Sequence, residues 1–541
     1  MNQFINRKED LVTEAIDGVL RTTGDRLARL DGYPHIKVVV RTDWDKSKVA
    51  LVSGGGSGHE PAHAGFVGAG MLTAAVCGEV FASPSVDAVL AGIMAVTGDA
   101  GCLLIVKNYT GDRLNFGLAA ERARALGRKV AMVIVDDDVA LPNLPQARGV
   151  AGTLFVHKIA GAMAEAGGTL EKIVETAQAV VDSVSSLGMS LDTCTVPGSP
   201  PEARIPLGKA ELGLGIHGEA GVDQIDFGGA AAAIDMVADK LASHLTETTQ
   251  IALINNLGAT TPLEMSILTE GLCSSKIGAS VEYIIGPAAM MTSLDMHGFS
   301  ISLLPARPEW VAALQAPVNL AAWPGIGAAT PPKIVPLPDG LTPIHPMRSE
   351  HAGHRAFIDK CCTVLIAAEK PLNALDAKSG DGDTGSTLAG AAKALQAAFD
   401  NLPLADMTQL FRAIGTELSQ TMGGSSGVLL AIFFNAAGDA SASGRDIVGA
   451  LQAGLDRVCE VGGASVGDRT MVDALAPALK ALADGDLQAA AKAARAGADA
   501  TAEITRAQAG RAAYVSATNL KGYNDPGAEA VAILFEAAMS K

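Results

Sequence analysis

The pattern of apolar positions divides the 541-residue chain into two unlike parts. In the first part, short apolar runs rich in β-branched residues alternate with stretches of helical spacing, which predicts buried strands separated by helices. We expect two α/β lobes with largely parallel, helix-covered sheets, over about residues 1–190 and 191–325. The expected strands are 36–40, 49–52, 103–106 and 130–135 in the first lobe and 251–254, 281–285 and 299–304 in the second, with first-lobe helices over 85–96 and 118–126.

The pattern changes after the second lobe. Residues 326–347 are dense in proline and lack helical periodicity, which predicts an extended linker. Beyond it the chain is rich in Ala and Leu at helical spacing, so residues 348–541 are predicted to form an all-α domain with glycine clusters in the loops. The clearest helix candidates are 355–369, 386–401, 407–421 and 487–507.

Charge and cysteine usage narrow the class of protein. A net charge of −17 disfavours a nucleic-acid partner, which requires a basic surface. The seven cysteines include no C-x-x-C pair, which suits reduced thiols. The N-terminal segment lacks the apolar core of a signal peptide, and no apolar run is long enough to span a bilayer. We therefore expect a soluble, cytoplasmic protein with no membrane partner.

A glycine-rich turn in the second part holds three carboxylates, Asp376, Asp381 and Asp383. Mg²⁺ prefers oxygen ligands, typically one or two carboxylates together with substrate phosphates, and glycines leave backbone amides free for anions. An EF-hand loop starting at Asp381 is excluded, because Gly385 and Ala392 occupy positions that need oxygen ligands. A solvated Asp/Gly turn explains the string as well as a metal site does.

Three further loops of the helical part favour the metal site. Residues 423–427 are glycine- and serine-rich and precede an apolar helix, which makes a good phosphate cradle. Residues 467–473 and 525–527 form other short turns, so one rim of the domain would gather metal, phosphate and base. The P-loop motif is absent, and the glycine run 54–58 fails the dinucleotide fingerprint because His59 replaces its last glycine.

In the first part, two strands end in residues able to carry chemistry. One strand runs into the glycine run 54–58 and His59, and another ends in Lys107, followed by Asp112. Ligands bind beyond the carboxyl ends of parallel strands, where His and Asp can exchange protons and Lys can hold an oxygen. A capped helix start and a structural turn explain the same residues.

A lone histidine, His217, stands among glycines that would let a ligand approach it closely. Histidine can serve as a base, a metal ligand or a covalent nucleophile. No second histidine at ligand spacing accompanies it, which disfavours zinc. The string alone leaves base, nucleophile and structural turn open.

Taken together and in order, these strings resemble the single-chain, ATP-dependent dihydroxyacetone kinases. The matching strings are Gly-Gly-Gly-Ser-Gly-His59-Glu-Pro, Lys107-Asn-Tyr-Thr-Gly-Asp112, Gly-Leu-Gly-Ile-His217-Gly-Glu, Asn255-Asn-Leu-Gly258, Met291-Thr-Ser-Leu-Asp-Met296 and the Asp-rich and Gly-Gly-Ser-Ser-Gly loops. The resemblance implies a two-lobed α/β kinase domain that binds the ketose, over 1–325. It implies an all-α domain over 348–541, an antiparallel barrel of eight helices that binds ATP and two Mg²⁺ ions, and it suggests a homodimer.

The resemblance also implies residue roles. His217 would hold the ketose as a covalent hemiaminal, and His59 and Asp112 would act as acid/base groups on the hydroxyl that receives the phosphoryl group. The substrate crevice would be lined by Gly56, Ser57, Gly58, His59, Lys107 and Asp112. The Mg²⁺ ligands would be Asp376, Asp381 and Asp383. The expected ATP contacts are Thr384, Gly385, Ser386, Thr387, Ser425, Ser426, Gly462, Met471, Arg511, Asp525, Pro526 and Gly527.

The expected reaction is ATP-dependent phosphorylation of a short-chain ketose, with dihydroxyacetone as the first choice. His297 stands near the expected substrate wall, where we expect a smaller residue, so a tetrulose such as erythrulose is an alternative substrate. A second alternative is an FAD-AMP lyase (cyclising) activity at the nucleotide site. A third is a non-catalytic, sugar-sensing co-regulator, which the complete set of expected catalytic and metal residues disfavours.

Overall fold

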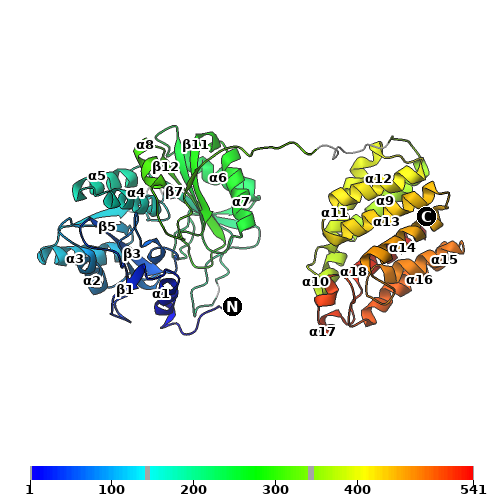
Figure 1. Ribbon diagram of the computed structural model, residues 1–541, viewed down its shortest axis with the longest axis horizontal. Coiled ribbons are helices and arrows are strands. Elements are labelled where there is room, and N and C mark those ends of the chain that lie inside the picture. Colours follow the sequence, from blue (N-terminus) through cyan, green and yellow to red (C-terminus); the bar gives the residue numbers. More distant parts are fainter. Residues whose placement is uncertain (1–2, 141–146, 201, 339–346, 540–541) are drawn as a thin grey trace. The chain divides into compact units, whose positions relative to one another are not determined.

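The computed structural model describes residues 3–140, 147–200, 202–338 and 347–539. Its contacts divide the chain into an α/β unit and a helical unit, which meet in sequence at Ile334 and Val335 (Figure 1). The hydrophobic pattern predicts this order, with an α/β part followed by an all-α part. Within the described residues, no helix combines the length and the apolar character needed to cross a membrane.

The first sheet of the α/β unit has the strand order β1-β2-β4-β3-β5-β6. Strands β4, β3, β5 and β6 are parallel, and β1 and β2 form an antiparallel edge. Every residue of β3 and β5 is buried, as expected for strands covered on both faces. The bounds are β1 Leu27–Arg29, β2 Val38–Arg41, β3 Ala50–Ser57, β4 Ala74–Val80, β5 Cys102–Lys107 and β6 Val130–Val135.

Successive side chains of these strands point to opposite faces, and each face is covered by helices. Val52 and Leu104 pack on one face with α2 and α3. Leu51 and Leu103 pack on the other face with α1, α4 and α5, in a core that continues into the second sheet. The helix bounds are α1 Leu11–Arg21, α2 Val86–Val96, α3 Thr110–Ala125, α4 Thr153–Glu165 and α5 Leu170–Val181.

The second sheet has the order β13-β11-β10-β12-β7-β8-β9 and is mostly antiparallel. Among the described strands, β10 and β11 form its one parallel pair, and they are joined through α7. The prediction of a second, largely parallel sheet is therefore wrong, because the other neighbouring strands are not joined by a helical crossover and apolar runs do not encode direction. The bounds are β7 Ser185–Ser190, β8 Lys209–Leu212, β9 Asp223–Asp226, β10 Gln250–Asn256, β11 Val281–Ala288, β12 Gly298–Pro305, β13 Ile326–Ala328, α6 Ala230–Ala242, α7 Pro262–Ser274 and α8 Pro308–Gln315.

Two predicted boundaries need correction. Strand β7 lies within residues 1–190, the range predicted for the first lobe, but it belongs to the second sheet. The two lobes therefore divide before Ser185. Strand β13 pairs with β11 inside the range 326–347 predicted as linker. This strand is short and directly follows Pro324 and Gly325, so the local composition gives no sign of a strand. Residues 339–346 of the predicted linker lie outside the described residues.

One buried carboxylate joins the two sheets. Asp137 follows β6 and accepts hydrogen bonds from the backbone N–H groups of Val150 and Gly152, both at 2.8 Å. It also accepts one from the hydroxyl of Ser186 in β7, at 2.5 Å. Burial raises the pKa of Asp137 to about 6. A single side chain thus ties β6, β7 and the start of α4 together.

The helical unit is built from helices that pack in sequence. Contacts run from α9 through α11, α12, α13, α14, α15 and α16 to α18, and α18 packs back on α9. Alanines let α15, α16 and α18 approach closely. The helix predicted over 487–507 ends earlier, at Ala500. The bounds are α9 Ala352–Ala367, α10 Glu369–Ser379, α11 Thr384–Ala398, α12 Met407–Thr421, α13 Gly424–Ala442, α14 Ile447–Gly462, α15 Val472–Ala483, α16 Leu487–Ala500, α17 Ala517–Leu520 and α18 Pro526–Met539.

The raised pKa of Asp137 makes stability depend on pH. The folded state holds this proton more tightly than the unfolded state, so the contribution is complete below about pH 4 and is lost as pH rises through the folded pKa of about 6. Relative to Asp137→Asn, the free energy of unfolding of the wild type should fall by up to ~3 kcal/mol between these limits. Urea unfolding at several pH values measures it, and equal pH dependence in both proteins would contradict the assignment.

Candidate active site

Glycine at the end of β3 makes room for two charged side chains. Gly55 has a φ of +146°, and a Cβ there would lie 2.8 Å from Lys107 Nζ and 3.4 Å from Asp112 Oδ2. Any side chain at this position would therefore displace the ammonium, the carboxylate or the strand itself. The structure thus brings Lys107 and Asp112 together on one side of the glycine run, as the sequence predicts.

Lys107 and Asp112 are both buried beneath the glycine run. Lys107 ends β5, and burial lowers its pKa although Asp112 and Asp137 oppose that shift. Asp112 lies in the first turn of α3, which begins eight residues before the predicted start. There its carboxylate accepts a hydrogen bond from the Ser83 hydroxyl.

His59 is a fully buried, neutral imidazole. Its Nδ1 lies 2.8 Å from the carbonyl oxygen of Thr292. Because a carbonyl only accepts, Nδ1 carries the hydrogen and Nε2 is an unprotonated acceptor, which has no hydrogen-bond partner among the described residues. Burial lowers the pKa of His59 well below its ordinary value, and the charges of Lys107 and His217 add to the shift.

His217 lies directly beside His59, with ring centroids 4.9 Å apart. The rings of Phe81 and Tyr109 also contact it, at centroid distances of 5.3 and 4.3 Å, and its side chain keeps 17% of its surface exposed. The imidazole is therefore held between aromatic rings while still reachable from solvent. Sequence motifs place His59 and His217 far apart, and the fold makes them one site.

Glu219 orients His217 and was not among the predicted site residues. Its Oε2 accepts a hydrogen bond from the backbone N–H of His217 at 2.8 Å, and its Oε1 lies 3.4 Å from Nδ1. Burial raises the pKa of Glu219, but the hydrogen bonds and charge of His217 outweigh it and lower the pKa to about 2. A carboxylate two residues after the histidine, in a tight glycine turn, is the signal that could have identified it.

The turn after His217 rests on a cysteine. Gly218 has a φ of +76°, and a Cβ there would lie 2.8 Å from Cys194 Sγ. Burial raises the pKa of the Cys194 thiol. With Leu214, Leu257 and Met296, this thiol forms an apolar cluster beneath the site.

Two residues near the expected substrate wall have partners within the fold. The hydroxyl of Ser57 donates to the backbone oxygen of Gly78 at 2.8 Å. The imidazole of His297 pairs with Glu264 of α7 at 3.0 Å. Leu294 lies against the glycine run, 3.2 Å from a Cβ at Gly58. The tetrulose alternative stays a prediction.

In the helical unit, the three predicted aspartates form one cluster. One oxygen of each of Asp376, Asp381 and Asp383 lies within 4.8 Å of the others. Asp376 lies in the last turn of α10, and its Oδ2 accepts from the backbone N–H groups of Gly382, Asp383 and Thr384 at 3.1, 2.9 and 3.1 Å. Asp376 thus folds the turn that carries the other two carboxylates, and these hard oxygen donors fit Mg²⁺.

Several predicted nucleotide contacts border this cluster. Residues 384–387 form the first turn of α11, directly after Asp383. Lys378, in the last turn of α10, places its ammonium 5.7 Å from the ring centroid of Tyr523. Tyr523 precedes the predicted segment 525–527, whose Gly527 lies against Met471, 3.3 Å from a Cβ at the glycine. Burial raises the pKa of Asp525 to about 6.

The other predicted nucleotide contacts lie on or after other helices than α10 and α11, which carry the aspartate cluster. Ser425 and Ser426 lie in the first turn of α13, and Gly462 ends α14 against Leu429 of α13. The side chain of Arg511 lies outside the described residues.

Arg469 is a further residue that sequence reasoning missed. It is buried and donates to the backbone oxygen of Tyr523 at 2.8 Å, which ties the loop before α15 to the loop before α18. Burial lowers its pKa. No local pattern marks it, because its acceptor comes from a distant loop.

The chain is similar to known proteins over nearly its whole length. The Dak1 domain family matches residues 17–322, and the DAK2 domain family matches residues 378–540. The chain is 48% identical to dihydroxyacetone kinase of Citrobacter freundii and 39% identical to triokinase/FMN cyclase of Rattus norvegicus, covering 99% of this chain and 98% of each relative. A crystal structure of the Citrobacter kinase in complex with AMP-PNP and Mg²⁺ matches with a TM-score of 0.67 and 46% identity, covering 99% of both chains.

Gly55→Ala tests the close packing over Lys107. The positive φ and the contact with the ammonium should lower the free energy of unfolding by ~1–3 kcal/mol. Gly117→Ala, on the same helix as Asp112 and with open space around the new methyl group, should leave it unchanged or raise it by up to ~1 kcal/mol. Chemical denaturation of both variants measures the difference, and equal stabilities would contradict the packing.

Proposed function

The chain belongs to the dihydroxyacetone kinase family, and we propose that it phosphorylates dihydroxyacetone with ATP while His217 holds the ketose covalently. The observation that carries this proposal is the contact between the rings of His217 and His59. Glu219 orients His217, and Nε2 of His59 has no hydrogen-bond partner among the described residues. One imidazole is placed to bind a carbonyl carbon, and the other is placed to accept a proton.

Glu219 prepares His217 for addition to a carbonyl group. With Nδ1 facing the carboxylate, Nε2 keeps the free electron pair. Nε2 forms a bond to the ketone carbon as the C=O π bond breaks, and the carbonyl oxygen takes up a proton from solvent. Nδ1 releases its proton to solvent past Glu219, whose side chain is 37% exposed, so one proton is taken up and one is released. Glycerol has no carbonyl group and cannot be held in this way.

His59 and Asp112 would act on the hydroxyl that receives the phosphoryl group. His59 Nε2 is an acceptor that has no hydrogen-bond partner among the residues that the structure describes, and Asp112 is a buried carboxylate beside the Lys107 ammonium. Both can accept the hydroxyl proton as the oxygen bonds to phosphorus, while Lys107 holds a substrate oxygen. The buried surroundings strengthen these interactions.

At the nucleotide end, Asp376, Asp381 and Asp383 would hold the Mg²⁺ ions, for which we propose two. When bound, Mg²⁺ neutralises phosphate charge and orients the ATP phosphates. The first turn of α13, which no side chain caps, presents backbone N–H groups suited to phosphate oxygens. We also propose that the ring of packed helices is the eight-helix antiparallel barrel of the family. A homodimer and a cytoplasmic location remain predictions.

A second activity deserves a test at the same nucleotide site. The rat relative is named triokinase/FMN cyclase and matches over nearly the whole chain. Cyclising cleavage of FAD would use the aspartate cluster and would not require the hemiaminal at His217. The two activities are therefore separable by substitution at His217.

His217→Ala tests the covalent anchor. The wild type should phosphorylate dihydroxyacetone and not glycerol, and the variant should lose kcat/KM for dihydroxyacetone by ~100-fold or more, because it lacks the group that fixes the carbonyl. Coupled kinase assays measure the rates, and native mass spectrometry should detect one bound ketose on the wild type alone. The assays should include both erythruloses and glyceraldehyde.

His244→Ala is the matched control, since His244 is an exposed histidine outside the site. It should keep wild-type rates. Phosphorylation of glycerol at ketone-like rates, or a ketose adduct that persists in His217→Ala, would refute the hemiaminal.

Asp381→Asn tests the aspartate cluster. Loss of one carboxylate ligand should raise the KM for Mg-ATP by ~10-fold or more and leave the ketose adduct intact. Titration with AMP-PNP and Mg²⁺ in a calorimeter gives the affinity directly. Asp484→Asn, an exposed aspartate after α15, serves as control, and unchanged Mg-ATP affinity in Asp381→Asn would exclude the cluster.

A further inference from the structure

Lys107 carries its ammonium into a fully buried position, where it needs a hydrogen-bond acceptor. His63 Nε2 lies 2.7 Å from Lys107 Nζ, whereas the backbone oxygen of Gly54 lies at 3.4 Å. Of these two acceptors, the imidazole of His63 is the closer to the ammonium. His63 follows the glycine run by only a few residues, but the predicted catalytic set does not include it.

The protonation of His63 follows from this contact. An ammonium only donates, so Nε2 of His63 accepts and Nδ1 carries the hydrogen. Burial lowers the pKa of His63 well below its ordinary value, and the charge of Lys107 adds to the shift, so the imidazole is neutral. Nδ1 has no hydrogen-bond partner among the described residues.

A second buried histidine braces the first. The ring of His157, from α4, meets His63 edge to face with centroids 5.2 Å apart. His157 Nε2 lies 3.1 Å from the hydroxyl of Ser53, which donates to the backbone oxygen of Ile105 at 2.7 Å. His63 is therefore fixed to β3 and β5, the two strands whose ends form the substrate crevice.

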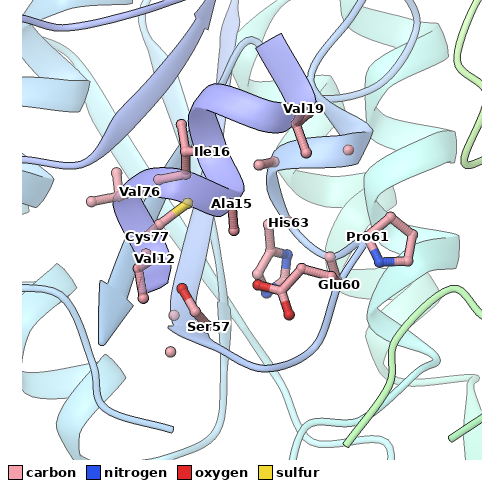
Figure 2. Close-up of a pocket in the computed structure, with 15 residues that line it drawn as sticks. Val12, Ala15, Ile16, Val19, Ser57, Glu60, Pro61, His63, Val76 and Cys77 are labelled. Atoms are coloured by element: carbon pink, nitrogen blue, oxygen red, sulfur yellow. The ribbon is translucent and has the colours of Figure 1, made fainter. Parts of the chain in front are cut away.

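His63 also lines a cavity of about 340 Å³, together with residues 55–57 of the glycine run (Figure 2). One wall is the apolar face of α1, including Ala15 and Val19, and Glu60 and Pro61 line the cavity beside His63. This space is large enough to admit a molecule the size of imidazole if the side chain of His63 were removed.

We propose that His63 is a positioning residue for phosphoryl transfer, which accepts the hydrogen bond of Lys107 and fixes the position of that ammonium beside Asp112. The proposal rests on the proposed kinase function. Without His63, the buried ammonium would shift from this position or lose its proton, and either change alters the electrostatic surroundings of the carboxylate proposed to receive the substrate proton. The effect falls on the chemical step rather than on ATP binding.

Kinetics of His63→Ala and His63→Gln test this role. His63→Ala should lower kcat for dihydroxyacetone phosphorylation by about 10- to 100-fold with an unchanged KM for ATP. Added imidazole should enter the enlarged cavity and restore much of the lost kcat. His63→Gln, whose amide oxygen can accept from Lys107, should retain more activity than the alanine variant.

Cys77→Ala is the matched control, because it enlarges the same cavity without touching Lys107. It should keep the wild-type kcat and show no response to imidazole. An active wild type whose His63→Ala variant keeps full kcat, or loses activity that neither imidazole nor glutamine recovers, overturns the positioning role. A wild type that phosphorylates no ketose overturns the proposed kinase function instead.

Discussion

The buried ammonium of Lys107 is the charge on which the arrangement of the catalytic unit depends. A buried cation is tolerated only where acceptors and opposite charges surround it. Gly55 lets the ammonium lie against β3, and Asp112 and Asp137 favour its charged form. Its positive charge in turn contributes to the low pKa values of His59, His63 and His157. Several imidazoles are thereby kept neutral, which is the form that accepts protons and hydrogen bonds.

Carboxylates that accept backbone N–H groups organise both units. Asp137 joins the two sheets of the α/β unit, and Asp376 folds the turn that carries the other two aspartates. In each case the carboxylate fixes a turn of the backbone by accepting its N–H groups, and this turn positions the side chains near it. Local sequence therefore determines the shape of each turn, while the fold determines which turns meet.

Sequence alone predicted what depends on local pattern. Strands β2, β3, β5 and β6 of the first sheet, the helical class of the second unit and the aspartate cluster follow from runs of neighbouring residues, whereas β1 and β4 were not predicted. Strand direction in the second sheet was not predicted correctly, because an apolar run is the same read either way. The role of His63 was missed because its contact with Lys107 joins a loop to a separate strand. The sequence predicted only the second half of α3, over residues 118–126, because its first turn lies in a glycine-containing segment.

The sulfur of Cys194, beneath the turn that carries His217, has a consequence for selectivity among nucleophiles. A thiolate adds readily to carbonyl carbons, and in the proposed mechanism it would divert the ketose into a hemithioacetal. Burial raises the pKa of Cys194, and a protonated thiol is a poor nucleophile. In the proposed mechanism, the preference for imidazole over sulfur would therefore depend on the apolar packing under the turn as much as on the histidine itself.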